Sequence, residues 1–171
     1  MFLVRLGLSA VLSLALLTPA PAQSVTLPDI AGPVLLTVTG LDRASHPGGQ
    51  IELDVGRLEA LGTTEVETSS IWTEGVHLYR GVALRTLADH LGMTTQTFRL
   101  HALNDYAVEF PIAEMTAEVP VLAFEMDGAP MSVREKGPVW LIYPYDLDAD
   151  YRTDTVYSRS IWQLDRIDVL R

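Results

Sequence analysis

The sequence contains no cysteine among its 171 residues. This absence excludes disulfides, cysteine-based zinc sites, iron–sulfur ligation, thiol redox chemistry and any thiolate ligand to a metal. Small exported domains often use disulfides where the core is small. Here the stability must come from the burial of apolar side chains.

Positive charge is also scarce. The chain has 12 Lys and Arg residues against 22 Asp and Glu residues, which gives a formal net charge of −10. Such a balance repels phosphate backbones and anionic lipid. We therefore expect no nucleic-acid partner and no binding to a membrane surface, whereas an unknown small ligand or a periplasmic partner protein remains compatible with the composition.

The apolar run near the start of the chain is too short to span a bilayer. It extends from Leu6 to Leu17, about twelve residues, whereas a membrane-spanning helix needs ~20. Arg5 precedes it, and Pro19 and a small-x-small site ending at Ala22 follow it. This pattern predicts a signal peptide over residues 1–22, with an uncleaved anchor as the alternative. We expect a periplasmic or secreted protein without stable membrane insertion after cleavage.

Removal of 22 of the 171 residues leaves 149, which suits one domain over residues 23–171. Since the removed segment holds one arginine and no acid, the remaining charge is near −11. Alternating or β-branched segments, typical of strands, are expected at 34–40, 51–55, 64–72, 97–103, 106–110, 119–125, 129–133, 139–143 and 163–170. Segment 73–81 is expected to be a loop, as is the acidic segment 145–155.

Two segments favour helices. Residues 55–61 follow Asp54, which is expected to cap them, and residues 82–91 carry an apolar stripe and end at Gly92. Strands outnumber helices without a strictly alternating βαβ order. The predicted class is therefore α+β, with mixed or mostly antiparallel β-sheets and few short helices.

Several groups of residues could carry chemistry. Asp146, Asp148, Asp150 and Asp154 have a calcium-loop-like spacing, but Tyr151 replaces the turn glycine and Tyr157 replaces the closing glutamate, so a solvated acidic loop is the favoured interpretation. The four histidines have no metal-ligand spacing, and no G-x-S-x-G surrounds a serine.

Aromatic residues lie at strand ends and in loops, where they form core or line a pocket for a flat ligand: Trp72, Tyr79, Tyr106, Trp140, Tyr143, Tyr145 and Trp162.

Five short motifs follow one another along the chain. They are Trp72-x-x-Gly75 followed by Tyr79-Arg80-Gly81-Val82-x-Leu84-x-x-Leu87, then Ala102-Leu103-Asn104-Asp105-Tyr106, Asp127-Gly128-Ala129-Pro130-Met131, Lys136 to Pro144, and Ser160-Ile161-Trp162-Gln163-Leu164-x-x-Ile167. In this order they resemble the motifs of the sulfite-oxidase-type molybdopterin-binding oxidoreductase family. The resemblance spans residue 34 to the C-terminus. It implies the sulfite-oxidase-type molybdopterin-domain fold, an oxidoreductase activity and a molybdopterin cofactor.

The metal-binding position of that family differs here. In metal-loaded members a cysteine just ahead of the equivalent tryptophan gives a thiolate to molybdenum, whereas this chain has Thr68-Ser69-Ser70-Ile71 there. A serine hydroxyl is not appreciably ionised in water and is a poor soft ligand. The family also implies export of the folded, loaded protein by a twin-arginine route, but the segment ahead of the apolar run holds only Arg5.

We therefore predict a periplasmic ligand-binding or sensory-accessory module without thiolate-ligated molybdenum. No cofactor is expected, although the resemblance implies molybdopterin, and no residue is assigned as catalytic or as a metal ligand. The expected ligand-binding residues are Ser69, Ser70, His46, Arg80, Asn104, Tyr106, Tyr143 and Arg159. Two alternatives stay open: a genuine molybdopterin-dependent oxidoreductase, and a structural partner subunit of another exported protein that docks through an edge strand or aromatic patch.

Overall fold

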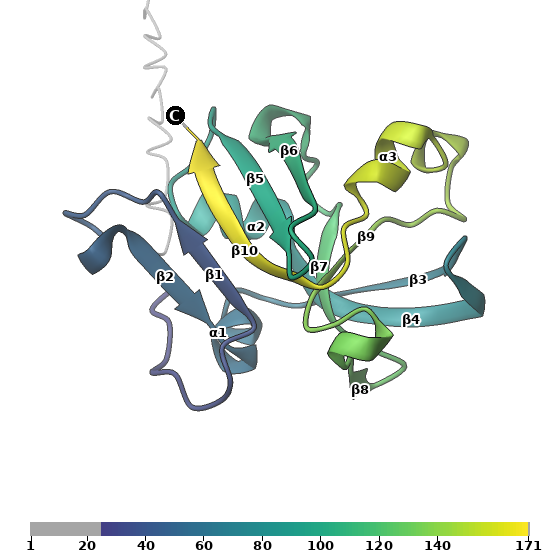
Figure 1. Ribbon diagram of the computed structural model, residues 1–171, viewed down its shortest axis with the longest axis horizontal. Coiled ribbons are helices and arrows are strands. Elements are labelled where there is room, and N and C mark those ends of the chain that lie inside the picture. Colours follow the sequence, from purple (N-terminus) through teal and green to yellow (C-terminus); the bar gives the residue numbers. More distant parts are fainter. Residues whose placement is uncertain (1–24, 171) are drawn as a thin grey trace, which may run out of the picture.

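The computed structural model describes residues 25–170 (Figure 1). The expected signal peptide, residues 1–22, lies outside the described residues. Within the described part of the chain, no helix has the length and apolar character needed to cross a membrane.

Two β-sheets form the framework. The first sheet has the strand order β2-β1-β10-β5-β6. Its strands are β1 (Leu36–Thr39), β2 (Gln50–Leu53), β5 (Thr97–Ala102), β6 (Ala107–Pro111) and β10 (Leu164–Leu170). β1 and β10 run parallel, with Val38 opposite Ile167, and the other neighbours in this sheet are antiparallel.

The second sheet has the order β3-β4-β7-β8, and β9 also pairs with β7. Its strands are β3 (Thr64–Ser70), β4 (Thr73–Ala83), β7 (Val121–Met126), β8 (Ala129–Pro130) and β9 (Trp140–Ile142). All its pairings are antiparallel. The long β3–β4 hairpin extends to one side of the molecule (Figure 1).

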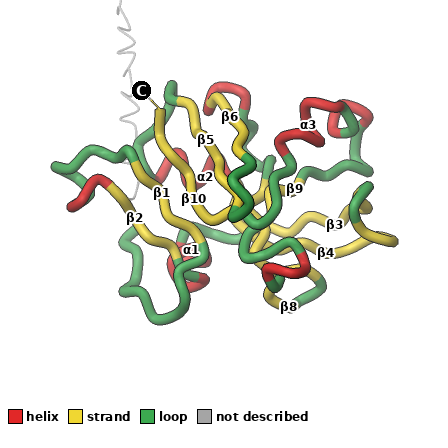
Figure 2. Tube along the Cα trace, in the orientation of Figure 1, coloured by secondary structure: helices red, strands yellow, loops and turns green. Residues whose placement is uncertain are grey.

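The helices are short and connect the sheets. α1 (Val55–Ala60) contacts β2 and β4, α2 (Leu84–His90) contacts β4, and α3 (Asp154–Arg159) contacts β6. Four single 3-10 turns lie in the connections, which Figure 2 shows as short red segments within green loops: η1 (Pro47–Gly49), η2 (Ile112–Glu114), η3 (Val133–Glu135) and η4 (Ala149–Tyr151).

A single buried apolar cluster joins the two sheets. It includes Leu36 and Ile167 from the first sheet and Val82 and Trp140 from the second, all fully buried. The backbone bridge between Val139 and Leu164 ties the start of β9 to β10. One core shared by both sheets fits a chain of this length.

The predicted α+β class is confirmed, as is the helix cap at Asp54. The Asp54 carboxylate accepts a hydrogen bond from the backbone N–H of Arg57 at 3.0 Å. α2 begins at Leu84 and not at Val82, because Val82 still pairs with Leu122 in the second sheet. The stripe predicted for this helix is nevertheless buried along its length.

Three expectations about secondary structure were wrong. The segment expected to be a loop after Trp72 is the long strand β4, and the acidic loop contains η4 and the start of α3. The strand expected over 129–133 ends at Pro130, since proline offers no N–H to a ladder and η3 begins three residues later.

Candidate functional site

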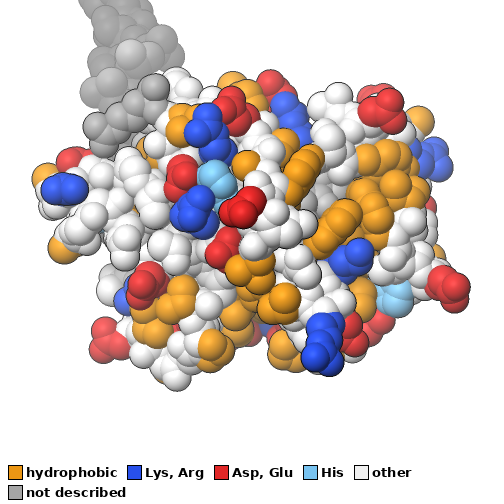
Figure 3. Space-filling view, viewed as in Figure 1, with side chains coloured by type: hydrophobic (Ala, Val, Ile, Leu, Met, Phe, Trp, Pro, Cys, Tyr) orange, Lys and Arg blue, Asp and Glu red, His pale blue; other side chains and the backbone are white. Residues whose placement is uncertain are grey.

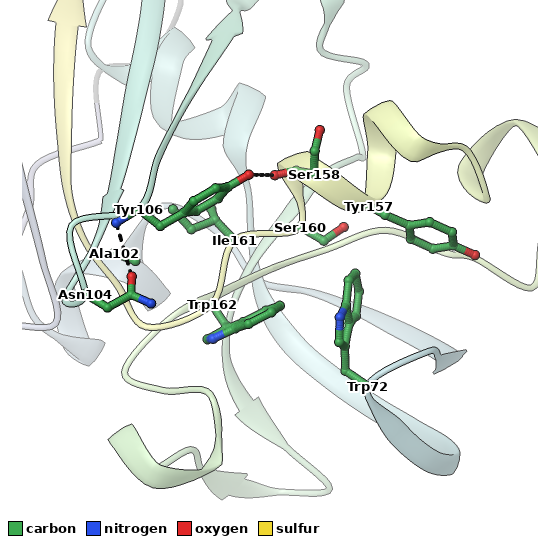
Figure 4. A pocket seen from close by; sticks show the side chains of 9 residues that line it. All are labelled: Trp72, Ala102, Asn104, Tyr106, Tyr157, Ser158, Ser160, Ile161 and Trp162. Atoms are coloured by element: carbon green, nitrogen blue, oxygen red, sulfur yellow. Dashed lines mark hydrogen bonds between the residues drawn. The ribbon is translucent and has the colours of Figure 1, made fainter.

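An apolar hollow lies where three distant segments of the chain meet, and hydrophobic side chains gather beside α3 on this face of the molecule (Figure 3). It has a volume of ≈ 230 Å³ (Figure 4). The turn between β3 and β4 contributes one residue, the β5–β6 connection contributes three, and the segment from α3 to β10 contributes five. The lining residues are Trp72, Ala102, Asn104, Tyr106, Tyr157, Ser158, Ser160, Ile161 and Trp162. We call this hollow the aromatic cavity.

Trp72 is held in place by other aromatic rings. Its ring centre lies 5.6 Å from those of Tyr157 and Trp162, 5.9 Å from that of Trp140 and 6.1 Å from that of Tyr145, all edge-to-face. This geometry places the positive edge of one ring on the negative face of another. The contacts hold the tip of the β3–β4 hairpin against the body of the protein.

Short-range hydrogen bonds fix the turn that carries Trp72. The hydroxyls of Ser70 and Thr73 are 2.7 Å apart, and the backbone N–H of Trp72 donates to Ser70 Oγ at 3.2 Å. The buried Tyr79 hydroxyl lies beside these two hydroxyls but makes no hydrogen bond of good geometry within the described residues. Burial raises the pKa of Tyr79, so this phenol stays neutral.

Ser160 organises the floor of the cavity. Its hydroxyl donates to the carbonyl of Val156 at 2.8 Å and accepts from the Tyr145 hydroxyl at 2.7 Å, while its carbonyl accepts from Trp140 Nε1 at 3.1 Å. Burial raises the pKa of Tyr145. The Ser160 hydroxyl therefore uses its donor and an acceptor position within the protein. A serine nucleophile needs a neighbouring base, and no base among the described residues faces this hydroxyl.

Tyr106 spans one side of the cavity. Its hydroxyl donates to the carbonyl of Ser158 at 2.8 Å, and its backbone N–H donates to Asn104 Oδ1 at 3.2 Å. Figure 4 shows the Tyr106 and Trp162 rings on opposite sides of the hollow, with Trp72 closing a third side. The ring nitrogen of Trp72 and the amide nitrogen of Asn104 donate no hydrogen bond to any described residue.

A single positive charge stands against the aromatic wall. The Lys136 ammonium lies 4.2 Å from the centre of the Trp162 ring and 5.9 Å from that of the Trp140 ring. Such contacts are favourable because the ring face is negative. The cavity wall is thus polarised by a cation that forms no salt bridge with the described carboxylates.

Of the eight predicted ligand-binding residues, Asn104 and Tyr106 line the aromatic cavity, and Ser70 supports its wall through Trp72. Ser69 lies on the outer edge of β3, where its N–H and hydroxyl donate to Asp146 at 2.5 and 2.7 Å. Tyr143 is buried, with its ring centre 6.2 Å from that of Tyr145, and burial raises its pKa.

The remaining three predicted residues lie outside this cavity. Arg80 is bound by Glu59 at 2.7 Å and Glu125 at 2.9 Å. Arg159 pairs with Glu114 at 2.7 Å and stacks on Phe110. His46 lines a separate, more open hollow of ≈ 390 Å³ beside β2. The structure therefore does not bring the eight residues together.

No sequence pattern indicated a site role for Tyr157, Ser158, Ser160 or Ile161. Three of them lie in or just after α3, a helix that the periodicity of the sequence did not predict. Trp72 and Trp162 were among the aromatic residues expected to form core or to line a flat-ligand pocket, and both line the cavity. The useful signal was the position of aromatic residues at strand ends.

The four aspartates with calcium-like spacing have other partners. Asp146 accepts from Ser69, Asp148 accepts from the backbone N–H of Asp150 at 2.9 Å, and Asp154 begins α3. Among residues 25–170, no three His, Cys, Asp or Glu side chains group closely enough to hold a metal ion.

Comparison with known proteins gives the family. The model of the oxidoreductase molybdopterin binding domain matches residues 55–148. The chain belongs to this family. The match begins at α1 and includes Trp72, Asn104 and Tyr106, whereas Tyr157 and Trp162 lie beyond it. A search of curated proteins found no match.

The residues at the site do not fit a thiolate-ligated molybdenum cofactor. No thiol is present, and the hydroxyls of Ser69 and Ser70 are already bonded to Asp146 and to Thr73. The carboxylate partners of Arg80 and Arg159 neutralise two guanidinium groups that could otherwise hold a phosphate. The aromatic cavity is also smaller than the ~300 Å³ at which typical ligand pockets begin.

Proposed function

We propose that this family member is a periplasmic ligand-binding or sensory-accessory module that works without molybdenum. The observation that supports it most directly is the aromatic cavity, which offers ring faces and unpaired N–H donors next to Trp72, while the segment just ahead of Trp72 contains no thiol. The signal-peptide-like segment near the start of the sequence also supports the proposal. It favours export of an unfolded chain, which could not carry a cofactor across the membrane.

The lining indicates the class of ligand. Trp72, Trp162 and Tyr106 present aromatic surface, on which a flat ring packs well. The free N–H groups of Trp72 and Asn104 suit acceptor atoms, and the Lys136 charge on Trp162 favours an electron-rich or anionic ring. We therefore expect a small planar molecule with carbonyl or carboxylate oxygens, of one or two rings given the volume.

The proposal is tested first by the content of the native protein. Protein purified from the periplasm of its own host is assayed for molybdenum by elemental analysis and for pterin by fluorescence after oxidation. We expect neither in a stoichiometric amount. Near-stoichiometric molybdenum with pterin would contradict the proposal and support the second candidate, a genuine molybdopterin-dependent oxidoreductase, which family membership favours.

The cavity itself is tested with planar probes. Titration with 2-naphthoate, followed by quenching of tryptophan emission, is expected to saturate in the wild-type protein. The variant Trp162→Ala should weaken binding about fivefold or more, since ring stacking contributes ~1–3 kcal/mol. The matched control Val133→Ala changes an exposed apolar residue outside the cavity and should bind as wild type. Equal binding by both variants would remove the cavity from the proposal.

A further inference from the structure

The free edge of β3 is a second candidate binding surface, separate from the aromatic cavity. β3 is the outermost strand on one side of the second sheet. The backbone N–H and C=O of Leu78 both bond to Asp127, across the sheet from β3. Leu78 is opposite Glu67 in the β3–β4 register. The pair between Glu67 and Leu78 is therefore not hydrogen-bonded, and the backbone groups of Glu67 face outward.

The same alternation fixes the other residues of this edge. In a β-strand the backbone N–H and C=O groups of every second residue point to the same side. Glu65 and Ser69 therefore also direct these groups away from β4. The N–H of Ser69 is satisfied by Asp146. Glu65 and Glu67 have no such partner among the described residues, which leaves two N–H and two C=O groups open.

A groove of ≈ 370 Å³ runs beside these open groups. Its apolar part is formed by Val119, Pro144, Leu147 and Tyr151, and Leu147 is 76% exposed. Exposed apolar surface next to unpaired strand groups is the arrangement that accepts an added strand.

The two outer strands of the first sheet, in contrast, are protected. On β2, the Arg57 guanidinium donates to the carbonyls of Glu52 at 3.0 Å and Pro28 at 2.8 Å. β6 ends at Pro111 and is contacted by α3. Proline and charged side chains are common ways of blocking a strand edge. β3 differs because the outward N–H and C=O groups of Glu65 and Glu67 have no such protection within the described residues.

The charge of the groove selects the partner. Glu65, Glu67 and Glu118 line it, and none forms a salt bridge within the described part of the chain. Arg80, which is opposite Glu65 in the register, is already bound by Glu59 and Glu125. The surplus of negative charge at this edge is therefore not neutralised internally.

We propose that β3 accepts an extended, basic segment of a partner protein as an additional strand. In such a strand successive side chains face opposite sides of the sheet. Lys or Arg at alternate positions would face Glu65 and Glu67, and apolar residues between them would face Val119, Pro144 and Leu147. Asp146 ends the open edge at Ser69, so the added strand is short.

The probe is a fluorescein-labelled hexapeptide of alternating lysine and valine, with an alternating glutamate and valine hexapeptide as its control. Fluorescence anisotropy is expected to show saturable binding of the basic peptide alone, weaker at high salt. Amide hydrogen exchange measured by NMR should slow at Glu65 and Glu67 on binding. It should not change at Val66, whose N–H already faces β4.

Two variants separate backbone pairing from charge. Glu67→Pro removes the outward N–H, which an edge strand tolerates, and should weaken binding at least about fivefold. Glu67→Gln keeps the N–H and should lose only about twofold to threefold. Glu74→Gln, an exposed acid on β4 outside the groove, is the matched control and should bind as wild type. Far-UV circular dichroism checks that Glu67→Pro is folded.

Absence of basic-peptide binding, or unchanged exchange at Glu65 and Glu67, would overturn the proposal. Full binding by Glu67→Pro would do the same and assign any affinity to surface charge. Failure here is distinct from failure of the cavity, because Trp162→Ala leaves the β3 edge unchanged and Glu67→Pro lies outside the aromatic cavity.

Discussion

At the scale of single residues, Asp54 ties two distant parts of the backbone together. Its carboxylate caps α1 through Arg57 and accepts from the N–H groups of Ala31 at 2.8 Å and Gly32 at 3.0 Å. These bonds, that of Ala31 first, lower the pKa of Asp54. Its stabilising effect is therefore present above the unfolded pKa, near 4, and is lost as pH falls through the folded pKa.

We predict that Asp54→Ala lowers the free energy of unfolding by about 1–2 kcal/mol, the usual effect of losing a helix cap. Urea denaturation at neutral pH measures it. Asp29→Ala, an exposed acid in the same region, should stay within about 0.5 kcal/mol of wild type. A smaller loss for Asp54→Ala than for this control would show that the cap is unimportant.

His77 is held between two acceptors. Nδ1 lies 2.6 Å from Asp127 Oδ2 and Nε2 lies 2.9 Å from the carbonyl of Glu74, so both nitrogens donate only when the ring is protonated. The bond to Asp127 raises the pKa of His77, and the bond from His77 lowers that of Asp127. Both partners of this ion pair are charged at pH values between the lowered pKa of Asp127 and the raised pKa of His77.

The stability contributed by His77 should be full below its unfolded pKa of about 6.5 and lost as pH rises through the higher folded value. Urea denaturation from pH 5 to pH 9 should show the difference between wild type and His77→Gln shrinking as pH rises. His90 serves as a control with the opposite pH dependence. Its pKa is lowered, mainly by burial and to a smaller extent by His46. A difference for His77→Gln that is independent of pH would refute the protonated state.

At the scale of elements, Gly81 allows the backbones of the paired strands β4 and β7 to approach closely. A Cβ at Gly81 would collide with the carbonyl of Leu122, next to the irregularity between Arg80 and Gly81. The obstacle is backbone and cannot rotate away. We predict that Gly81→Ala destabilises the protein by more than about 3 kcal/mol.

Gly56 is the matched position for this test. It lies in α1, where an added Cβ meets nothing closer than 3.7 Å, and Gly56→Ala should be neutral or stabilising by up to about 1 kcal/mol. Thermal and urea unfolding of the two variants provide the comparison. Similar effects of both substitutions would mean that the close approach of β4 and β7 relaxes easily.

The elements that the sequence predicted have one buried face or, like β7 and β9, are buried along most of their length. α1 and α2 have caps or apolar stripes, and β5 alternates between buried and half-buried positions. β4 was not predicted because its outer half projects beyond the core, so Val76 and Leu78 are exposed at 59% and 38% and the usual pattern is absent. α3 buries none of its residues fully, which explains why periodicity did not indicate it.

At the scale of the whole molecule, both sheets share one apolar cluster. We therefore predict a single cooperative unfolding transition, with the same midpoint by far-UV circular dichroism and by tryptophan fluorescence. The fluorescence reports mainly the region around Trp72, Trp140 and Trp162, while the dichroism reports both sheets. Two separate midpoints would mean that the sheets unfold independently.

The overall class and family followed from the sequence, because short motifs in the right order constrain a fold even when each is weak. The cavity did not follow, since its walls come from segments near residues 72, 104 and 160 that no local pattern connects. The same holds for Arg80, whose partners are 21 and 45 residues away. Pairing of this kind depends on tertiary structure.

The place of β10 determines when the first sheet can form. β10 comes latest in sequence among the described strands, yet it is the central strand of the first sheet and pairs with β1, and Thr39 bonds Asp168 across 129 residues. Until residues 164–170 are available, β1 and β5 have no strand between them and the apolar cluster lacks Ile167. A growing chain in which this segment is still inside the ribosome therefore lacks the centre of its first sheet, and that sheet is completed only after the segment has emerged.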